Sequence, residues 1–342
     1  MLTAGPHSTR RKGSRVRSIV PRVAACAAGL FLFVLAPGLA HAASDQHLLA
    51  TYQPVTILDP LEQFQPTAVH EFVQDADLEQ LQSNSWVVVN NDPDLDELPG
   101  PGTGVWRLNQ DPCTPAMPVG GLACYAAAEQ GGRSTVYGRV AHVDAAIVLQ
   151  YWYFYYDDVY SYTYPPSDLI WQAHEGDWEV VNVVLSADET PLYVGYSQHC
   201  LGERRDWAAT PRHDTHPIVH VAIGSHANEF AAGTHLTNTA CIPDLVIDWL
   251  VANGYSLPVD YAGEGEVAGP SEAGGIVTRI RELTADDPPT WLAFPGRWGE
   301  DQYFHAAPLS TRAFAFGVSP TGPAQHSIWS DPLGTLAGWP PG

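Results

Sequence analysis

Residues 134–156, STVYGRVAHVDAAIVLQYWYFYY, decide the fold of this chain. The run is dense in β-branched and aromatic residues, which is typical of strands. Three similar runs follow between turn signals, at residues 178–186, 191–199 and 217–226. Nearly continuous apolar runs of this kind indicate strands that are covered on both faces of a sheet.

The rest of the chain is rich in turn-forming residues, with 30 glycines and 29 prolines among 342 residues. Before residue 130 we expect loops, a short helix at 75–83 and a short strand at 85–91. Two further helices are expected at 243–254 and 274–283, and Trp329 and Trp339 should anchor the tail. With no repeat and no linker, the sequence predicts a mainly β protein, a single-domain β-sandwich spanning 43–342 with long loops and a few peripheral helices.

The first 42 residues have the composition of an export signal. A basic region precedes the apolar run VAACAAGLFLFVLAPGLA and the small-residue sequence AHA. We therefore expect cleavage near Ala42 and a secreted, extracellular protein. A permanent membrane anchor is less favoured, because the apolar run is shorter than about 20 residues and contains Pro37.

The chain is strongly acidic, with 38 Asp and Glu against 16 Lys and Arg and a net charge of −22. Six of the basic residues lie in the predicted signal, so the mature chain would carry about −28. A surface of this charge repels phosphate backbones, and we expect no nucleic-acid partner. It attracts divalent cations, and no integral membrane segment is expected in the mature chain.

Four cysteines remain after the signal: Cys113, Cys124, Cys200 and Cys241. In an exported chain they favour two disulfides, of which three pairings are possible. Cys113 and Cys124 flank a Pro/Gly-rich loop that a short bridge would close, which leaves Cys200 with Cys241. A zinc site is the rival interpretation, but the sequence has no C-x-x-C pair.

The segment HEGDWE at 174–179 places one imidazole and three carboxylates at the start of a predicted strand. The two-residue period of a strand puts Asp177 and Glu179 on one side, about 7 Å apart. Gly176 permits a sharp turn that returns His174 toward them. We interpret this as a divalent-cation site, since unpaired carboxylates beside a core destabilise it. The alternative is a solvated strand end.

Other ligand-type residues also end predicted strands. His199 ends YSQH, His226 ends IGSH, and Asp157 and Asp158 end LQYWYFYYDD. They would form one cluster if these strand ends lie at the same end of the sandwich. His220, inside an apolar run, is interpreted as a core histidine.

Five segments together resemble the vacuolar protein sorting-associated protein 62 family. They are LQYWYFYYDD, HEGDWEVVNVVL, YSQHC, IGSHAN and FPGRWGE, in order between about 134 and 330. The resemblance implies a secreted or compartment-facing domain and says little about biochemistry.

The segment AHEGDWE at 173–179 is also similar, more distantly, to the G-H-R-H-D-W-E motif of the necrosis- and ethylene-inducing (NPP1-like) toxins. His174, Asp177 and Glu179 match that motif, while Gly176 replaces its second histidine. The resemblance implies a cytolytic-type β-sandwich and a divalent cation held by these three residues and Asp157. The replacement at Gly176 places membrane-damaging activity in question.

Two function classes follow. The first is a secreted, metal-binding, toxin-like effector whose ion, Ca²⁺ or Mg²⁺ rather than Zn²⁺ or Mn²⁺, organises a surface for a glycan or glycolipid headgroup. Tyrosines of DDVYSYTYPP, residues 157–166, would provide a stacking face. The second is a metal-assisted hydrolase or lyase acting on an extracellular carbohydrate or ester, with His199 or His226 as the base. The absence of H-E-x-x-H and G-x-S-x-G motifs favours binding.

Overall fold

A computed structural model describes residues 45–110, 134–161, 171–237, 244–252, 254, 257–301 and 317–342. The predicted signal peptide lies outside the described residues, and so do Cys113, Cys124 and Cys241. Cys200 lies in the turn between two strands of the main sheet. Signal cleavage and both disulfide pairings therefore stay predictions.

The main sheet has six strands in the order β17-β5-β6-β7-β8-β9. Its centre is the antiparallel pair β6 and β7, each of 16 residues, and only the β17–β5 pair is parallel. The strands are β5 (Thr135–Val143), β6 (Ala146–Ser161), β7 (Trp171–Ser186), β8 (Pro191–Gln198), β9 (Leu201–Asp206) and β17 (Arg279–Glu282). All of the apolar runs at 134–156, 178–186 and 191–199 fall in this sheet.

A second sheet has the order β10-β11-β1-β15-β16, with β12 also paired to β11. Its strands are β1 (Val55–Leu58), β10 (Arg212–His213), β11 (His216–Val221), β12 (Asn228–Glu229), β15 (Val267–Gly269) and β16 (Ile276–Val277). Smaller sheets are β13 (Gly233–Leu236) with β14 (Val259–Ala262), and β3 (Ser85–Asn91), β2 (Ala76–Gln82) and β4 (Trp106–Gln110) in the order β3-β2-β4. The mainly β, sandwich-like fold is as predicted.

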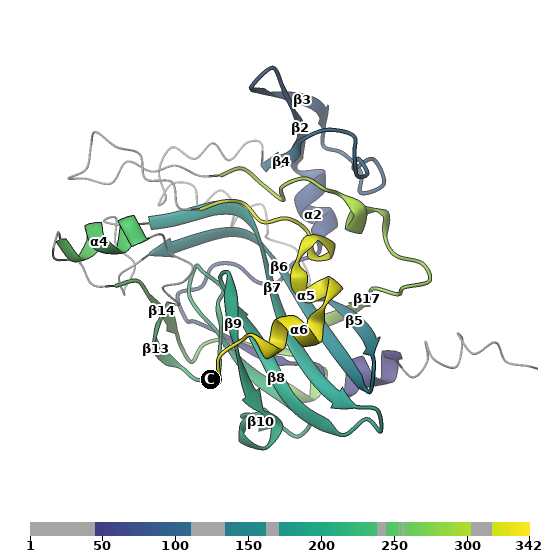
Figure 1. Ribbon diagram of the computed structural model, residues 1–342, viewed down its shortest axis with the longest axis vertical. Coiled ribbons are helices and arrows are strands. Elements are labelled where there is room, and N and C mark those ends of the chain that lie inside the picture. Colours follow the sequence, from purple (N-terminus) through teal and green to yellow (C-terminus); the bar gives the residue numbers. More distant parts are fainter. Residues whose placement is uncertain are drawn as a thin grey trace, which may run out of the picture.

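Helices are short and peripheral, also as predicted (Figure 1). They are residues 45–51, α2 (Val69–Gln74), α4 (Asp244–Ala252), α5 (Ser327–Ser330) and α6 (Pro332–Ala337), with single turns η1 (Trp207–Ala209), η3 (Ser271–Ala273), η4 (Thr290–Ala293) and η5 (Pro323–Gln325). The expected helix at 243–254 is confirmed as α4. Within the described part of the chain, no helix has both the length and the apolar character needed to cross a bilayer.

The core covers both faces of the main sheet. Every residue of β6 from Val148 to Val159 is buried, which confirms the interpretation of that run. On one face, the Tyr196 hydroxyl donates a hydrogen bond to the Ile218 carbonyl of the second sheet. On the other face, Phe154 and Trp178 contact the buried ring of Trp298. Helices α5 and α6 lie over the main sheet in Figure 1.

Two predicted helices are strands in the structure. Residues 75–83 form most of β2, which is paired on both sides, and residues 274–283 contain β16 and β17. Each segment is long enough for fewer than three helical turns. Long-range strand pairing outweighs such weak local preference, because each segment meets a free strand edge. The expected strand at 85–91 is confirmed as β3.

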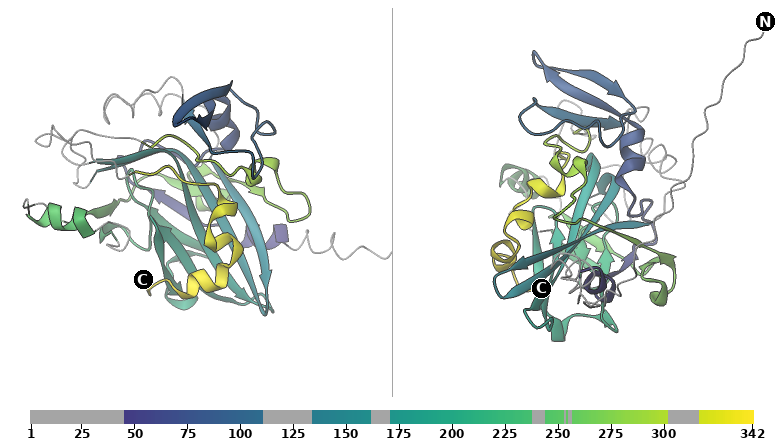
Figure 2. Two further views of the ribbon diagram at one scale, coloured as in Figure 1. Left: turned by 45° about the horizontal axis from the view of Figure 1, so that its top comes forward. Right: turned by 90° about the vertical axis from the view of Figure 1, so that its right-hand side faces the viewer.

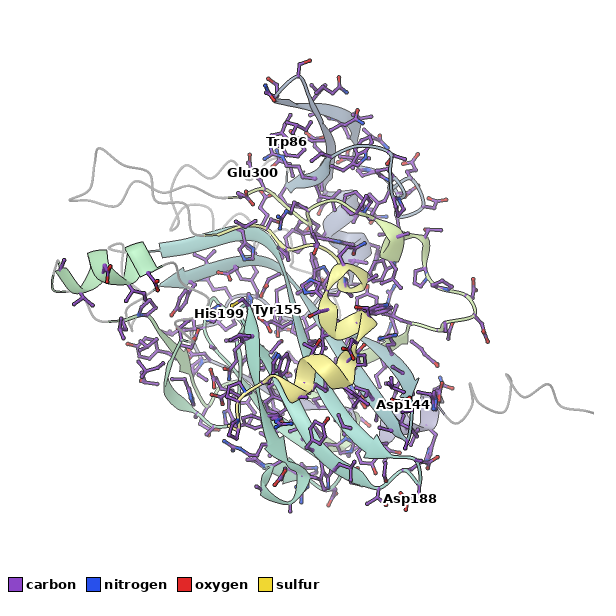
Figure 3. All side chains as sticks on the ribbon, viewed as in Figure 1. Trp86, Asp144, Tyr155, Asp188, His199 and Glu300 are labelled. Carbon is purple, nitrogen blue, oxygen red and sulfur yellow. The ribbon has the colours of Figure 1, made fainter. Side chains whose placement is uncertain are left out.

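The small sheet β3-β2-β4 projects from the body of the protein, as the two views of Figure 2 show. Arg107 of β4 links this sheet to the rest of the protein. The Arg107 guanidinium forms an ion pair with Glu300 at 2.9 Å and stacks over the Trp86 ring, 4.5 Å from its centroid. Trp86 and Glu300 are labelled at this end of the molecule in Figure 3.

The C-terminal tail is tied to the sheet by buried groups, as expected. Trp339 is 7% exposed, and Asp331 caps α6 by accepting a hydrogen bond from the Gly334 N–H at 3.0 Å.

We expect Asp331→Ala to lower the free energy of unfolding by about 1 kcal/mol, because the Gly334 N–H at the start of α6 loses its hydrogen-bond acceptor. Urea unfolding measures this loss. Asp96→Ala, at an exposed aspartate, is the control and should change stability by less than about 0.5 kcal/mol.

Candidate cation site at one end of the main sheet

Gly176 determines which side chains share a face of the β6–β7 pair. In a regular strand His174 and Asp177 would point to opposite faces, since they are three positions apart. Gly176 instead adopts a φ of +60°, a left-handed conformation that glycine tolerates. The register pairs Asp158 with His174 and Tyr155 with Asp177 on either side of this irregularity. As a result, His174 and Asp177 meet on the same face.

Three buried side chains converge there: Asp158, His174 and Asp177. One ligand atom of each lies within 4.8 Å of the others. His174 Nε2 is 3.5 Å from Asp158 Oδ2. The set of two carboxylates and one imidazole is a donor set that divalent cations accept.

The orientation of the His174 ring is fixed by the turn itself. Its Nδ1 lies 2.8 Å from the Gly176 carbonyl oxygen. A carbonyl only accepts hydrogen bonds, so Nδ1 is the donor and Nε2 carries the lone pair of the neutral ring. A metal-binding histidine is usually held in this way by a carbonyl or carboxylate behind it. Nε2 therefore faces Asp158 and Asp177 as a ligand.

One oxygen of the Asp158 carboxylate lacks a partner. It is 4% exposed, and its Oδ1 makes no hydrogen bond to the described residues. Burial raises its pKa to about 7, although attraction to His174 works in the other direction. An orphaned carboxylate oxygen beside two other ligand atoms fits a bound cation, which would favour the ionised form.

Asp157, which the sequence predicted as a ligand, is separated from this cluster. It lies opposite Glu175 in the register and is fully buried, and neither of its side-chain oxygens accepts a hydrogen bond of good geometry from a described residue. Burial, followed by repulsion from Glu175 and Asp158, raises its pKa well above the usual value. The structure thus groups Asp158, and not its neighbour Asp157, with His174 and Asp177.

Behind the cluster, His226 links Asp177 to the core. Its Nδ1 donates to Asp177 Oδ2 at 3.0 Å, its Nε2 lies 3.7 Å from Glu62 Oε1, and its ring stacks on Tyr155 with centroids 3.8 Å apart. Burial lowers the pKa of His226, but Glu62 and Asp177 outweigh burial and raise it well above the usual value. The hydrogen bond from the buried His226 ring therefore positions Asp177.

Glu179, the fourth predicted ligand, lies on the same face but bonds elsewhere. Its carboxylate accepts a hydrogen bond from the Ser197 hydroxyl and lies 3.4 Å from Asn228 Nδ2. Burial and the charge of Asp177 raise its pKa well above the usual value. Glu179 is thus close enough to Asp177 to interact with it, although it is not one of the three convergent groups.

His199 belongs to a separate hydrogen-bonded group around Asp260. His199 Nε2 lies 3.0 Å from Asp260 Oδ2, and Asp260 also accepts from the hydroxyls of Ser225 at 2.6 Å and Thr237 at 2.9 Å. The His199 ring contacts Tyr160, two positions beyond Asp158 on β6. In Figure 3, Tyr155 and His199 lie away from the turns marked by Asp144 and Asp188.

Sequence reasoning identified His174, Asp177, His199 and His226 as site residues but missed Glu62 and Asp260. Glu62 follows β1, and Asp260 lies on β14, one strand of a two-stranded sheet. Neither residue lies near a recognisable motif, and the alternation of polar and apolar residues along β14 does not mark Asp260 as a site residue. Only the packing of distant segments brings them to the site. The predicted core position of His220 is confirmed by its 7% exposure.

Comparisons with known proteins give weak structural matches. No protein-family model and no curated protein matches the chain. A solved structure described as "Toxin fold as basis for microbial attack and plant defense" is 12% identical, covers 85% of this chain and 90% of its own, and has a TM-score of 0.35. Necrosis and Ethylene inducing Protein 2 from the causal agent of cocoa's Witches Broom disease is 16% identical, with coverages of 54% and 67% and a TM-score of 0.29.

A third match, "NLPPya in complex with glucosamine", is 14% identical, with coverages of 55% and 67% and a TM-score of 0.30. These matches are with proteins of the kind that the AHEGDWE segment resembles, but at these scores they do not assign the chain to a family. None of the comparisons supports the resemblance to the vacuolar protein sorting-associated protein 62 family.

Proposed function

We propose that this chain is a secreted, cation-dependent binding protein of the toxin-like effector type. Asp158, His174 and Asp177 hold a divalent cation, Ca²⁺ or Mg²⁺, and the ion binds the headgroup of a glycan or glycolipid. The observation that carries the proposal is the convergence of these three buried groups within 4.8 Å, with His174 Nδ1 held by a backbone carbonyl.

Electrostatics support the cation. Two carboxylates that approach each other in a buried site repel and are poorly solvated, and several kcal/mol can be lost in this way. A divalent cation reverses this penalty, and a chain with a net charge of −22 attracts cations from solution.

The cation would have coordination positions left open for a glycan ligand. Ca²⁺ takes about six to eight oxygen ligands, so three protein groups leave positions for water or for sugar hydroxyls. The three side chains are 4% to 8% exposed, which places them just beneath the surface. The predicted tyrosine stacking face gains no support from Tyr160, which is 2% exposed and hydrogen-bonded to Thr237.

The alternative, a metal-assisted hydrolase or lyase, is less favoured by the two histidines proposed as its base. His226 is fully buried and its Nδ1 donates to Asp177, while His199 Nε2 lies 3.0 Å from Asp260. A general base must reach the proton that it removes from the substrate, whereas these two rings bond to carboxylates of the protein. This supports binding over hydrolysis at the site.

The test is cation-linked stability. Chelator should lower the melting temperature of the purified protein, and Ca²⁺ or Mg²⁺ should restore it, because a ligand present at 100 times its Kd stabilises by about 2.7 kcal/mol. Elemental analysis of protein purified without chelator identifies the ion. Glycan-array binding with and without chelator then tests whether the ion carries ligand binding.

Three conservative variants locate the site. Asp158→Asn and Asp177→Asn should abolish the response to chelator, whereas Asp157→Asn, one position away on the other side of the strand, should retain it. A response that survives in Asp177→Asn and disappears in Asp157→Asn would contradict this assignment of ligands. Loss of glycan binding without loss of the cation response would separate the ligand from the ion.

A further inference from the structure

A pocket remote from the cation cluster has no assigned role. It has a volume of about 590 Å³ and lies beside β5, beyond the point where β17 ends. It is lined by residues 139–143 of β5, by residues 282–286, and by Asp45, Pro288, Leu292, Trp329, Ser330 and Pro332. Gln150, the register partner of Arg139, is eight positions from Asp158 on β6, or about 26 Å at ~3.3 Å per residue. The volume is typical of small-molecule sites.

Arg139 presents a rigid guanidinium to this pocket. Its Nη1 donates to Gln150 Oε1 at 2.6 Å and to the Trp329 carbonyl at 2.8 Å, and its guanidinium lies over the Trp329 ring at 4.1 Å. Gln150 is itself fixed by Asn182 at 3.1 Å. No carboxylate of the described chain forms an ion pair with Arg139, and burial lowers its pKa to about 10. The remaining donors of the guanidinium are therefore pre-oriented and only partly solvated.

Carboxylates line the same pocket without pairing with that cation. Glu282 and Asp286 form no ion pair with Arg139, and neither has a side-chain hydrogen bond to another described residue. Burial and the charge of Asp45, which is paired with His142, raise the pKa of Glu282. Arg139 and three carboxylates, those of Asp45, Glu282 and Asp286, thus line one pocket, and none of the three pairs with Arg139. The register places Arg139 beside Gln150 and Glu282 beside Gly138, so the two charged groups lie on opposite sides of the edge of β5.

We propose that this pocket binds a small zwitterion, whose carboxylate lies against Arg139 and whose ammonium group lies against Glu282 and Asp286. An arginine with free donors binds a carboxylate through two parallel hydrogen bonds. An anion without the ammonium group would meet the excess negative charge of the pocket, and a cation without the carboxylate would leave Arg139 unpaired. Apolar atoms of Leu283 and Leu292 would contact the part of the ligand between its charges.

The test uses ω-amino acids from glycine to 8-aminooctanoate, each compared with the carboxylic acid and the amine of the same length. Isothermal titration calorimetry on the full protein should show one preferred length, bound at least about tenfold more tightly than either singly charged analogue. The chain length of the preferred ω-amino acid indicates the distance between the Arg139 guanidinium and the carboxylates of Glu282 and Asp286. Absence of binding by every member at millimolar concentration would overturn the proposal.

Variants separate the contribution of Arg139 to binding from that of Glu282. Arg139→Gln should weaken binding of the zwitterion and of the carboxylic acid, while Glu282→Gln should weaken binding of the zwitterion and of the amine but not of the carboxylic acid. Arg205→Gln is the matched control, because Arg205 also stacks on an aromatic ring at 4.1 Å, that of Phe230, but lines no part of this pocket. If Arg139→Gln does not fold, Arg139→Lys and Glu282→Gln supply the comparison. Unchanged affinity in Glu282→Gln and in the folded Arg139 variant would refute the assignment.

Discussion

Gly176→Ala should lower the free energy of unfolding by more than about 4 kcal/mol, which is large for a single methyl group. Two costs add. A non-glycine residue in the left-handed region costs roughly 1–2 kcal/mol, and Gly176 has a φ of +60°. In addition, a Cβ at this position would lie 2.0 Å from the Trp298 carbonyl oxygen, so the backbone of one of the two segments must move.

The matched control is Gly254→Ala. Gly254 has a φ of +77°, but a Cβ there would meet no atom within 4 Å. This variant therefore measures the conformational cost alone, at about 1–2 kcal/mol. Urea unfolding of both variants separates conformational strain from steric clash. Equal losses in the two variants would show that Trp298 does not constrain Gly176.

Gly176→Ala should also weaken the response to cations, since the Gly176 carbonyl orients His174. A moved carbonyl releases the His174 ring, and Nε2 no longer faces Asp158 and Asp177. In any fraction of the variant that remains folded, added Ca²⁺ should raise the melting temperature less than in the parent chain.

Local sequence predicted the main sheet and the sharp turn at Gly176, but not the complete cluster. The strands β6 and β7 carry so many β-branched and aromatic residues that their local preference and their burial agree. The choice between Asp157 and Asp158 depends on where the alternation of β6 is broken, near Tyr156. That break is matched to Gly176 across the strand pair, and no residue in β6 itself indicates it.

The incorrect helices at 75–83 and 274–283 have a related cause. The segments contain only three and four apolar residues, so their period is ambiguous between helix and strand. The strand conformation of β2 is stabilised by pairing with β3 on one side and β4 on the other. Its buried Glu79 also forms an ion pair with Arg107 of β4. Charge pairing across strands is invisible to a local pattern, and the same applies to Glu62 and Asp260 at the site.

Asp260→Asn should cost roughly 3–5 kcal/mol, because it leaves a buried imidazolium without its counter-charge. Asp260 is 2% exposed and accepts hydrogen bonds from His199, Ser225 and Thr237. Burial raises the pKa of Asp260, but attraction to His199 and these bonds outweigh burial and lower it. An asparagine amide keeps one acceptor oxygen and replaces the other with a donor that faces further donors.

The same pair gives a pH dependence with a defined sign. Burial lowers the pKa of His199, but Asp260 outweighs burial and raises it from 6.5 to about 10. The folded-state pKa exceeds the unfolded value, so the contribution of His199 to stability is complete below pH 6.5 and is lost as the pH rises to about 10. In Asp260→Asn, burial dominates, and the His199 pKa should fall below its raised value toward or below 6.5.

NMR titration of the His199 ring measures this shift directly, and urea unfolding at pH 7 measures the loss of stability. Asp45→Asn is the matched control, since Asp45 also lies 3.0 Å from a histidine Nε2, that of His142, but this pair is partly exposed. Partly exposed pairs of this kind contribute about 0–1 kcal/mol, so the control should lose far less stability. A His199 pKa that stays near 10 in Asp260→Asn would mean that Asp158 and Glu179, the other carboxylates acting on it, hold the proton instead. In that case His199 would be coupled to the cation cluster, and added Ca²⁺ would lower its pKa by competing for the same charge.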